Sequence, residues 1–386
     1  MKDLIINLLD LNPNLTGREI SKKLGIDRKA INSFLHENAD SFYQNESTYQ
    51  WCNLKKSDEE IIIACSSGWI DAEIFENNIL IHSNLFEKDL IRFVFKGTQL
   101  LLDAILRLLC ITNQLSFAKK KVVLDFNNCI NTYNYINRIG FFKCLSKDVI
   151  VLPRRPNEFL ANKYHGNSGN LVEIFKIIPS NQANDEMAKI SAVFEDNFSK
   201  EESLFLLPKL RSFIANLIDN VREHGHSDLD GFSALQIYHP NKNLDQKKII
   251  LVVADNGLGL TNTLRKALKL NKYKDIASQL SKENLDHTKK LISLVFNLGG
   301  ISQTGDENRG LGLHEIHRNL QKLPKIQTME SLNLNNIQVT VSIRQDTYQI
   351  NFPYKDKPLV VEDMTSLNHL TKINGTQFIL TILLTK

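Results

Sequence analysis

The residues best suited to bind a ligand lie in three short stretches in the second half of the chain. In the first stretch, Asp255, Gly257 and Gly259 follow an apolar run that ends at Ala254. Asp-Asn-Gly is ordinary turn chemistry because glycine tolerates positive φ, so this stretch alone could form only a tight turn. The second stretch, RGLGL at 309–313, ends a glycine-rich segment that runs into a helical pattern. Backbone N–H groups that are free at the start of a helix favour phosphate binding.

The third stretch lies on a long amphipathic helix that we predict over residues 203–224. Asn216, Asn220 and Glu223 are spaced i, i+4 and i+7, which places their side chains on one face of the helix. Two asparagines on a helix are usually solvated surface, but here apolar residues lie between them. We therefore do not expect this face of the helix to be fully exposed to solvent.

Taken in order, these stretches resemble the motifs of a known superfamily. The strings NLIDNVREHG, DNGLG, RGLGL and GTQFIL are similar to the N, G1, G2 and final-strand boxes of the GHKL ATPases. That superfamily includes DNA gyrase, MutL, histidine kinases and anti-sigma-factor kinases. The resemblance covers roughly residues 200–386, about half the chain. It implies a C-terminal ATP-binding domain over 185–386 with the fold of a two-layer α/β sandwich.

On this resemblance, ATP is the ligand and Asp255 recognises its base. The Asp255 carboxylate would accept a hydrogen bond from the adenine amino group, which selects adenine over guanine. Thr376, in the final strand, would support Asp255 directly or through a water. Gly257 and Gly259 would let the backbone pass close beneath the base, where any Cβ would collide.

The resemblance also assigns the phosphate end of the site. Asn220 would give a neutral oxygen to Mg²⁺, a hard ion that prefers oxygen ligands and keeps several waters. Gly310 and Gly312 would pack against the phosphates, with residues 302–309 as a mobile lid. Arg309 in that lid would either reach the γ-phosphate or stay solvated, and the sequence leaves both open.

One position departs from the hydrolysing members of the superfamily. They place a glutamate four residues before the asparagine that binds Mg²⁺, and here that position is Asn216. An amide cannot accept a proton near neutral pH, so the usual general base is missing. Glu223, on a similar face of the helix, is the remaining candidate for a catalytic residue. We therefore expect a slow ATPase, or a switch in which bound ATP changes contacts with the other domains or with a second subunit.

Two other functions stay open from the sequence. The ending NVREHG resembles protein serine/threonine kinases of the anti-sigma-factor type, although those enzymes have glutamate at the position of Asn216. The other alternative is a transcription regulator that uses the ATP fold as a sensor. Autokinase activity is not expected, because none of the upstream histidines His36, His82 and His165 lies on a convincing dimerisation helix.

The first 55 residues read as helix, helix, turn, helix and hairpin, a pattern typical of a winged helix-turn-helix. They are similar to Z-alpha-type winged helices. The resemblance implies that Lys29 and Asn32 contact DNA or RNA phosphates and that Trp51 is the wing tryptophan, and Arg28 belongs to the same basic cluster. Acidic and basic residues are equal in number over 1–55, so this region has no net positive field. A protein-binding or purely structural role therefore stays open.

Residues 56–180 alternate strand-like and helical runs, which indicates a small α/β domain. They resemble the STAS-like domains that accompany some bacterial ATP-binding proteins. The loop NNCINTYNY lacks the D-S-S-G-like pattern of phosphorylated STAS regulators, so we expect a scaffold role or a dimer contact. Within this region, residues 95–115 are predicted to form an amphipathic helix.

The composition agrees with an α+β multidomain protein. A chain of 386 residues is long enough for two or three domains, and a net charge of +4 is too small to indicate a nucleic-acid or membrane partner. The five cysteines include no C-x-x-C pair, which favours a reducing compartment over a disulfide framework. The N-terminus carries acids too early for a signal peptide, and the most apolar segment, 100–111, is too short to span a bilayer. We expect a cytoplasmic bacterial regulator with no membrane partner.

Overall fold

The structure is a computed structural model of the 386-residue chain. It describes residues 1–12, 15–38, 41–44, 49–53, 59–64, 68–80, 85–157, 162, 166, 168–178, 184–224, 227–240, 246–280, 282–302, 310–324, 336–355 and 357–385. Over these residues the fold is mixed α and β with several sheets, as expected for an α+β multidomain protein.

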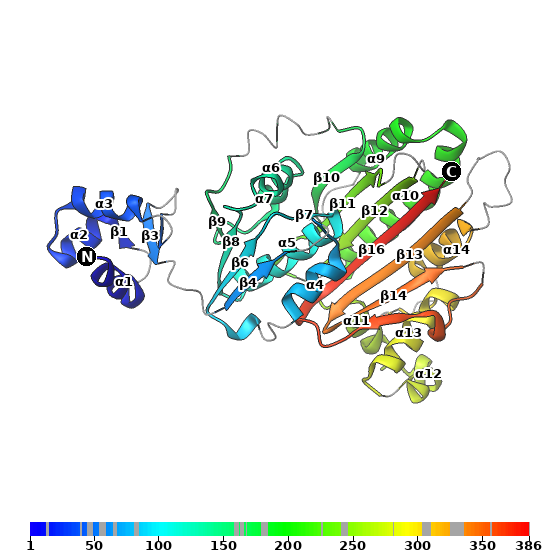
Figure 1. The fold of residues 1–386 in the computed structure, drawn as a ribbon. Coiled ribbons are helices and arrows are strands. Elements are labelled where there is room, and N and C mark those ends of the chain that lie inside the picture. Colours follow the sequence, from blue (N-terminus) through cyan, green and yellow to red (C-terminus); the bar gives the residue numbers. More distant parts are fainter. Residues whose placement is uncertain are drawn as a thin grey trace.

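The N-terminal unit consists of three helices and a small antiparallel sheet (Figure 1). Its elements are α1 (Lys2–Leu11), β1 (Leu15–Thr16), α2 (Gly17–Leu24), α3 (Arg28–Glu37), β2 (Phe42–Gln44) and β3 (Gln50–Asn53). A capping box between Thr16 and Glu19 begins α2, and Gly25 ends it with a φ of 66°. Helix α3 begins at Asp27, whose carboxylate accepts a hydrogen bond from the Ala30 N–H. These local signals explain why two separate helices form here.

The C-terminal half is organised around a seven-stranded sheet in which every neighbouring pair is antiparallel. In spatial order the strands are β10 (Leu171–Ile177), β11 (Gly231–Tyr238), β12 (Gln246–Ala254), β16 (Ile373–Thr385), β13 (Asn336–Asp346), β14 (Tyr348–Tyr354) and β15 (Thr365–Leu367). Strand β16 therefore lies between β12 and β13, although it is the last strand along the described chain. Successive side chains of a strand point to opposite faces, so each central strand contributes to two cores.

Helices cover one face of this sheet (Figure 1). They are α9 (Asn184–Asn197), α10 (Lys200–His224), α11 (Leu260–Ala267), α12 (Lys274–Gln279), α13 (Leu285–Leu298) and α14 (Gly312–Leu320), with the 3-10 turns η3 (Asn271–Tyr273) and η6 (Val361–Asp363). Alternate strand residues such as Leu251 and Val253 pack against these helices. We call this the helical face.

The opposite face is covered by the central region of the chain. That region contains a parallel sheet in the order β4 (Glu59–Ile63), β6 (Leu90–Phe95), β8 (Lys121–Asp125) and β9 (Ile150–Leu152). It also contains β5 (Trp69–Ile70), α4 (Ala72–Leu80), η1 (Leu85–Glu87), β7 (Gln99–Leu100), α5 (Leu102–Phe117), α6 (Ile130–Arg138) and α7 (Phe141–Cys144). One hydrophobic core joins these elements to Ile250, Val252 and Ile379 of the large sheet. We call this side the back face.

Helix α5 lies between the two sheets and is buried on all sides from Leu102 to Ser116. The sequence predicted an amphipathic helix here, so its burial is greater than expected. The reason is that its buried polar side chains, such as Arg107, Asn113 and Gln114, find hydrogen-bond partners in the surrounding elements, so the polar side of the helix can be covered too. Only at Phe117, which is 53% exposed, does the helix emerge.

From the sequence we expected a central domain at 56–180 and an ATP-binding domain at 185–386. The packing of the elements does not follow this division. Strand β10, at Leu171–Ile177, pairs with β11 and forms the edge of the seven-stranded sheet. The central region and the C-terminal half also share the continuous core around α5. The N-terminal unit contacts the central region through Lys121, whose Nζ donates to the Asn53 carbonyl oxygen at 2.6 Å.

No helix within the described ranges is both long and apolar enough to cross a membrane.

Candidate functional site

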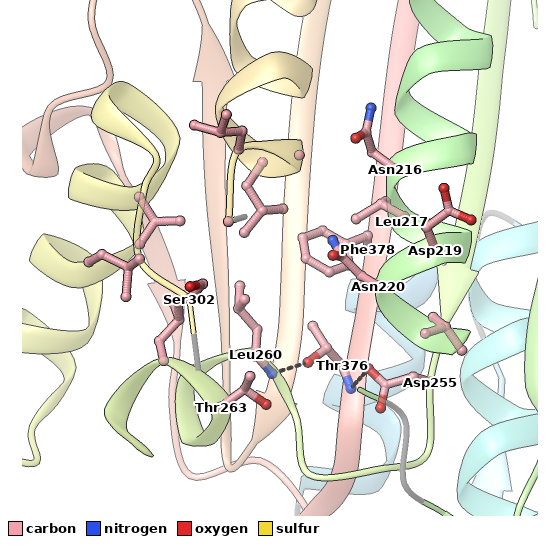
Figure 2. A pocket seen from close by; sticks show the side chains of 18 of the residues that line it. Asn216, Leu217, Asp219, Asn220, Asp255, Leu260, Thr263, Ser302, Thr376 and Phe378 are labelled. Atoms are coloured by element: carbon pink, nitrogen blue, oxygen red, sulfur yellow. Dashed lines mark hydrogen bonds between the residues drawn. The ribbon is translucent and has the colours of Figure 1, made fainter. Parts of the chain in front are cut away.

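A cavity of about 480 Å³ opens on the helical face of the sheet. Its walls come from α10, α11, the start of α14 and strand β16 (Figure 2). Of the residues predicted from the sequence, those that line it are Asn216, Asn220, Asp255, Gly259, Gly310, Gly312 and Thr376. The fold therefore brings four stretches that are far apart in the sequence to one place.

Asp255 lies at one end of the cavity, directly after β12. Its Oδ1 accepts a hydrogen bond from the Gly257 N–H at 2.7 Å, and its Oδ2 accepts one from the Thr376 N–H at 3.1 Å. Burial raises the pKa of this carboxyl to about 6, against the opposing effect of the two backbone donors. No cationic side chain of the described residues contributes to the shift. Asp255 is thus an acid held in position by backbone amides, with no counter-ion in the part of the chain that the structure describes.

Thr376 supports Asp255, as expected, but it does so through its backbone. Besides the N–H contact, its carbonyl oxygen accepts from the Asp255 N–H at 2.9 Å. The Thr376 hydroxyl turns toward α11, where it accepts from the Leu260 N–H at 2.7 Å. It also approaches Gln345 Oε1 at 3.4 Å. The side chain of Thr376 therefore fixes the start of α11, and its backbone fixes the acid.

Two glycines hold the backbone in left-handed conformations beside Asp255. Gly259 has a φ of 80°, and a Cβ there would lie 2.9 Å from the Gly375 carbonyl oxygen. Gly375 has a φ of 77°, and a Cβ there would clash with the Asp255 carbonyl group. Gly375 was not predicted from the sequence, although it directly precedes the predicted site residue Thr376. Gly257 does not line the cavity, and its role here is the N–H bond to Asp255.

Asn216 and Asn220 project from the same side of α10, with Asn220 closer to Asp255 (Figure 2). The Asn216 Nδ2 donates to the Ser212 carbonyl oxygen at 2.8 Å. Its Oδ1 faces the start of α14, where a Cβ on Gly312 would lie only 2.9 Å away. Within the part of the chain that the structure describes, no group hydrogen-bonds the Asn220 amide. That amide is available to a ligand in the cavity.

The N-terminus of α14 forms the other end of the cavity. Gly310, Leu311, Gly312 and Leu313 line it, and the N-cap residue Leu311 has no side chain that could cap the helix. The N–H groups in the first turn of a helix have no acceptor inside the helix, so they are free to bind a ligand. Gly310 has a φ of 76°, and a Cβ there would clash with the Ile301 backbone. A larger residue at 310 would therefore change the approach of the chain to α14.

Two carboxylates that the sequence analysis did not select also line the cavity. Asp219, next to Asn220, pairs with Arg222 at 3.4 Å, and Glu315 accepts a hydrogen bond from the Ser212 hydroxyl at 3.1 Å. Both could have been predicted from the sequence, because each lies close to a selected residue. Asp219 adjoins Asn220, and Glu315 follows Gly312 by three positions. Among the described residues, no group of three or more His, Cys, Asp or Glu side chains could hold a metal ion by itself.

Two predicted site residues lie outside what the structure describes. They are Arg309, together with the rest of the segment 303–309, and the side chain of Glu223. The backbone of Glu223 belongs to the last turn of α10. Their expected roles stay predictions.

The nucleic-acid candidates lie on α3 in the N-terminal unit. Arg28 and Lys29 are exposed, whereas Asn32 is partly buried and its Oδ1 lies against Gly17. Trp51, expected at the wing, is 2% exposed and packs in the core, with the His36 ring edge-on at 4.9 Å. The two cations are thus open to a partner, and the tryptophan is a core residue.

Comparisons with known proteins add no relative from which the role of these residues could be transferred. No protein-family model, no curated protein and no solved structure was found to match this chain.

Proposed function

We propose that the cavity binds ATP with Mg²⁺ and that the protein acts as a slow, nucleotide-gated switch or ATPase. The observation that carries the proposal is the polarity of the cavity. Among the described residues, it has an acid without a counter-ion at one end and a helix N-terminus without a side-chain cap at the other. An adenine nucleotide has the matching polarity, with a hydrogen-bond donor on the base and negative charge on the phosphates.

At the acid end, the Asp255 carboxylate accepts the adenine amino group. Each of its oxygens already takes one backbone N–H, which fixes the direction of the remaining lone pairs. Guanine has a carbonyl oxygen where adenine has the amino group, so two acceptors would face each other. The apolar side chains Val295, Ile301 and Phe378 line the same cavity and give the base surfaces to pack against.

At the other end, the start of α14 receives the phosphates. The helix dipole and the free N–H groups of its first turn both favour an anion there. The Asn220 amide oxygen and the Asp219 carboxylate offer Mg²⁺ the oxygen ligands that it prefers. Because no larger cluster of acids is present among the described residues, the phosphates and waters would complete the coordination.

Hydrolysis is expected to be slow because of Asn216. Its amide cannot take a proton from water near neutral pH, and its nitrogen is held by the Ser212 carbonyl oxygen. General base catalysis is typically worth about 10²–10⁴-fold in rate. ATP would then stay bound long enough to act as a signal, and Glu223 is the candidate for whatever base activity remains.

The N-terminal unit would connect this signal to a partner. Arg28 and Lys29 are exposed at the start of α3, and Arg18, Lys22 and Lys23 on α2 are exposed as well. Such a surface fits a phosphate backbone, and we propose weak, largely sequence-independent contact with DNA or RNA.

Calorimetry with a non-hydrolysable ATP analogue tests the proposed site. The Asp255→Asn variant should bind more weakly by roughly 1.5–3 kcal/mol, since it loses a hydrogen bond to a charged group. The matched control is Asp275→Asn on the exposed surface of α12, which should bind like the wild type. The corresponding GTP analogue should not compete. Wild-type binding no tighter than that of Asp255→Asn would refute the assignment.

A further inference from the structure

A buried side chain from the back face reaches both backbone segments that build the acid end of the cavity. Gln114, on α5, is 3% exposed. Its Nε2 donates to Asn256 Oδ1 at 2.7 Å and to the Asn374 carbonyl oxygen at 2.9 Å. Its Oε1 accepts from the Asn374 N–H at 2.8 Å. One amide from the central region therefore joins the residue after Asp255 to the residue before Gly375.

The contacts of Asn256 fix the direction of its amide. The Asn256 Nδ2 donates to the Asp230 carbonyl oxygen at 2.6 Å, so its oxygen must face Gln114. Asn256 is 5% exposed and has no room to turn toward solvent. Its backbone lies between Asp255 and Gly257, the residue that donates to the Asp255 carboxylate. A shift of Gln114 would therefore reach the Asp255 carboxylate through Asn256 and the adjoining Gly257.

A second side chain of α5 holds the same segment of β16 from its other end. Arg107 lies seven positions before Gln114, which is the same face of the helix. Its guanidinium hydrogen-bonds the Gln377 side chain, and Gln377 directly follows Thr376. Helix α5 thus contacts Asn374 and Gln377, which flank Gly375 and Thr376. The Thr376 N–H in turn donates to the Asp255 carboxylate.

We propose that Gln114 is a positioning residue for Asp255, so that the packing of α5 on the back face and nucleotide affinity are coupled. This inference rests on the proposed nucleotide site. Coupling of this kind is reciprocal. Bound nucleotide stabilises the packing of α5 against Asn256 and Asn374, and any event in the central region that displaces α5 lowers nucleotide affinity by the same factor. The central region then regulates the site, in addition to covering the sheet.

The neighbouring residue on α5 provides a matched control. Asn113 is also a buried amide, but its Nδ2 donates to the Cys144 carbonyl oxygen at 3.0 Å and its Oδ1 accepts from the Ser146 N–H at 2.8 Å. Both partners of Asn113 belong to the central region. Gln114→Met and Asn113→Leu each replace a buried amide by an apolar side chain of similar size, so both should lower the melting temperature.

The discriminating measurement is the dissociation constant for a non-hydrolysable ATP analogue. Gln114→Met should weaken binding about three- to tenfold, the effect of losing one or two neutral hydrogen bonds. Asn113→Leu should leave the constant unchanged despite its lower melting temperature. Equal constants for wild type and Gln114→Met, or equal losses in both variants, would overturn the inference.

A double-mutant cycle with Asn256→Ala tests whether Gln114 acts through Asn256. The two substitutions remove the same contact from opposite sides, so their effects on nucleotide affinity should be less than additive. If Gln114→Met does not fold, Asn256→Ala alone still tests the proposal. Unchanged nucleotide affinity in that variant would contradict it. A wild-type protein that binds no nucleotide would instead refute the proposed function itself, and the two failures are distinguishable.

Discussion

The two faces of the seven-stranded sheet carry buried acids whose pKa values are shifted in opposite directions. On the back face, burial alone would raise the pKa of Glu76, but the adjacent Arg107 and Arg344 guanidinium groups lower it below its usual value. On the helical face, burial raises the pKa of Asp255 to about 6, and no cation within the described ranges opposes it. The difference separates an acid paired with arginines inside the fold from an acid that borders a cavity, as a binding residue would. Glu76 is paired with two arginines, whereas among the described residues Asp255 has only backbone N–H partners.

The largest effect is expected from breaking the back-face ion cluster. Glu76→Gln leaves Arg107 and Arg344 buried without an anion, and such a loss destabilises a protein by about 3–5 kcal/mol. Urea unfolding measures this change. Glu73→Gln, on the exposed side of the same helix, should have little effect. A loss in Glu76→Gln as small as that in Glu73→Gln would remove the contrast between the two faces.

The next effect concerns turnover on the helical face. Asn216→Glu places a carboxylate beside the start of α14 and should raise ATP hydrolysis by about 10²-fold, the lower range for general base catalysis. Asn216→Gln has the same length without the charge and should stay slow. Phosphate release at saturating ATP is the measurement. Fast hydrolysis in the unsubstituted protein would contradict the slow-switch proposal.

Glu223→Ala tests whether Glu223 is the general base for the slow hydrolysis. If Glu223 is the base, this substitution abolishes the residual hydrolysis and leaves binding of the non-hydrolysable analogue intact. Unchanged hydrolysis would assign Glu223 to the helix surface.

The pH dependence should also differ between the faces. The native pKa of Asp255, about 6, lies above the ordinary value of 3.8, so the unliganded native state holds this proton more tightly than the unfolded state does. The stability contributed by Asp255 is therefore present at low pH and lost as pH rises from about 4 to 6. For Glu76 the shift is downward, so its contribution is present above the ordinary pKa and lost as pH falls.

Nucleotide binding should show the titration of Asp255 directly. The protonated acid is a poorer acceptor for the adenine amino group, so affinity should fall as pH drops below about 6, by up to about tenfold per pH unit. Phosphate groups of the nucleotide titrate in the same range, so the comparison is with Asp255→Asn, in which only the nucleotide titrates. Parallel pH profiles for the two proteins would show that Asp255 does not contact the base.

The smallest effect is expected at the N-terminal unit. Removing the charges of Arg28 and Lys29 together should weaken nucleic-acid binding at low salt and reduce the slope of log affinity against log salt by about two. Fluorescence anisotropy over a salt series measures it. Lys272 and Lys274, an exposed pair outside this unit, supply the control double substitution. Absence of binding to the wild type even at about 50 mM salt would make this unit a protein-interaction module.

The sequence predicted the helical face better than the back face, for a physical reason. Asp255 and Gly259 share a seven-residue string, and Asn216 and Asn220 are one helical turn apart, so local spacing already groups them. Their gathering into one cavity agrees with that prediction, and the roles of these residues stay predictions. Gly375 was missed because its constraint comes from the Asp255 backbone across the sheet.

The back face has no such local pattern. Glu76, Arg107 and Arg344 meet from separate parts of the chain, and no spacing rule connects them. The apolar run of α5 indicated a helix but gave no indication that a second sheet would cover it. For the same reason β10 was assigned to the central region, since an isolated strand pattern does not reveal which sheet it joins.

The central place of β16 in the sheet has a consequence for synthesis on the ribosome. Strand β16 separates β12 from β13, so until residues 373–385 have emerged the sheet consists of two halves with unpaired inner edges. Thr376 and Gln377 are then also missing, so neither the complete cavity nor the contacts of α5 with β16 can form. A nascent chain at that stage exposes the part of α5 that β16 covers and two open strand edges, which favours aggregation or chaperone capture. The cavity is complete only after this late strand has been inserted, so a ligand of the cavity could not guide the earlier steps of folding.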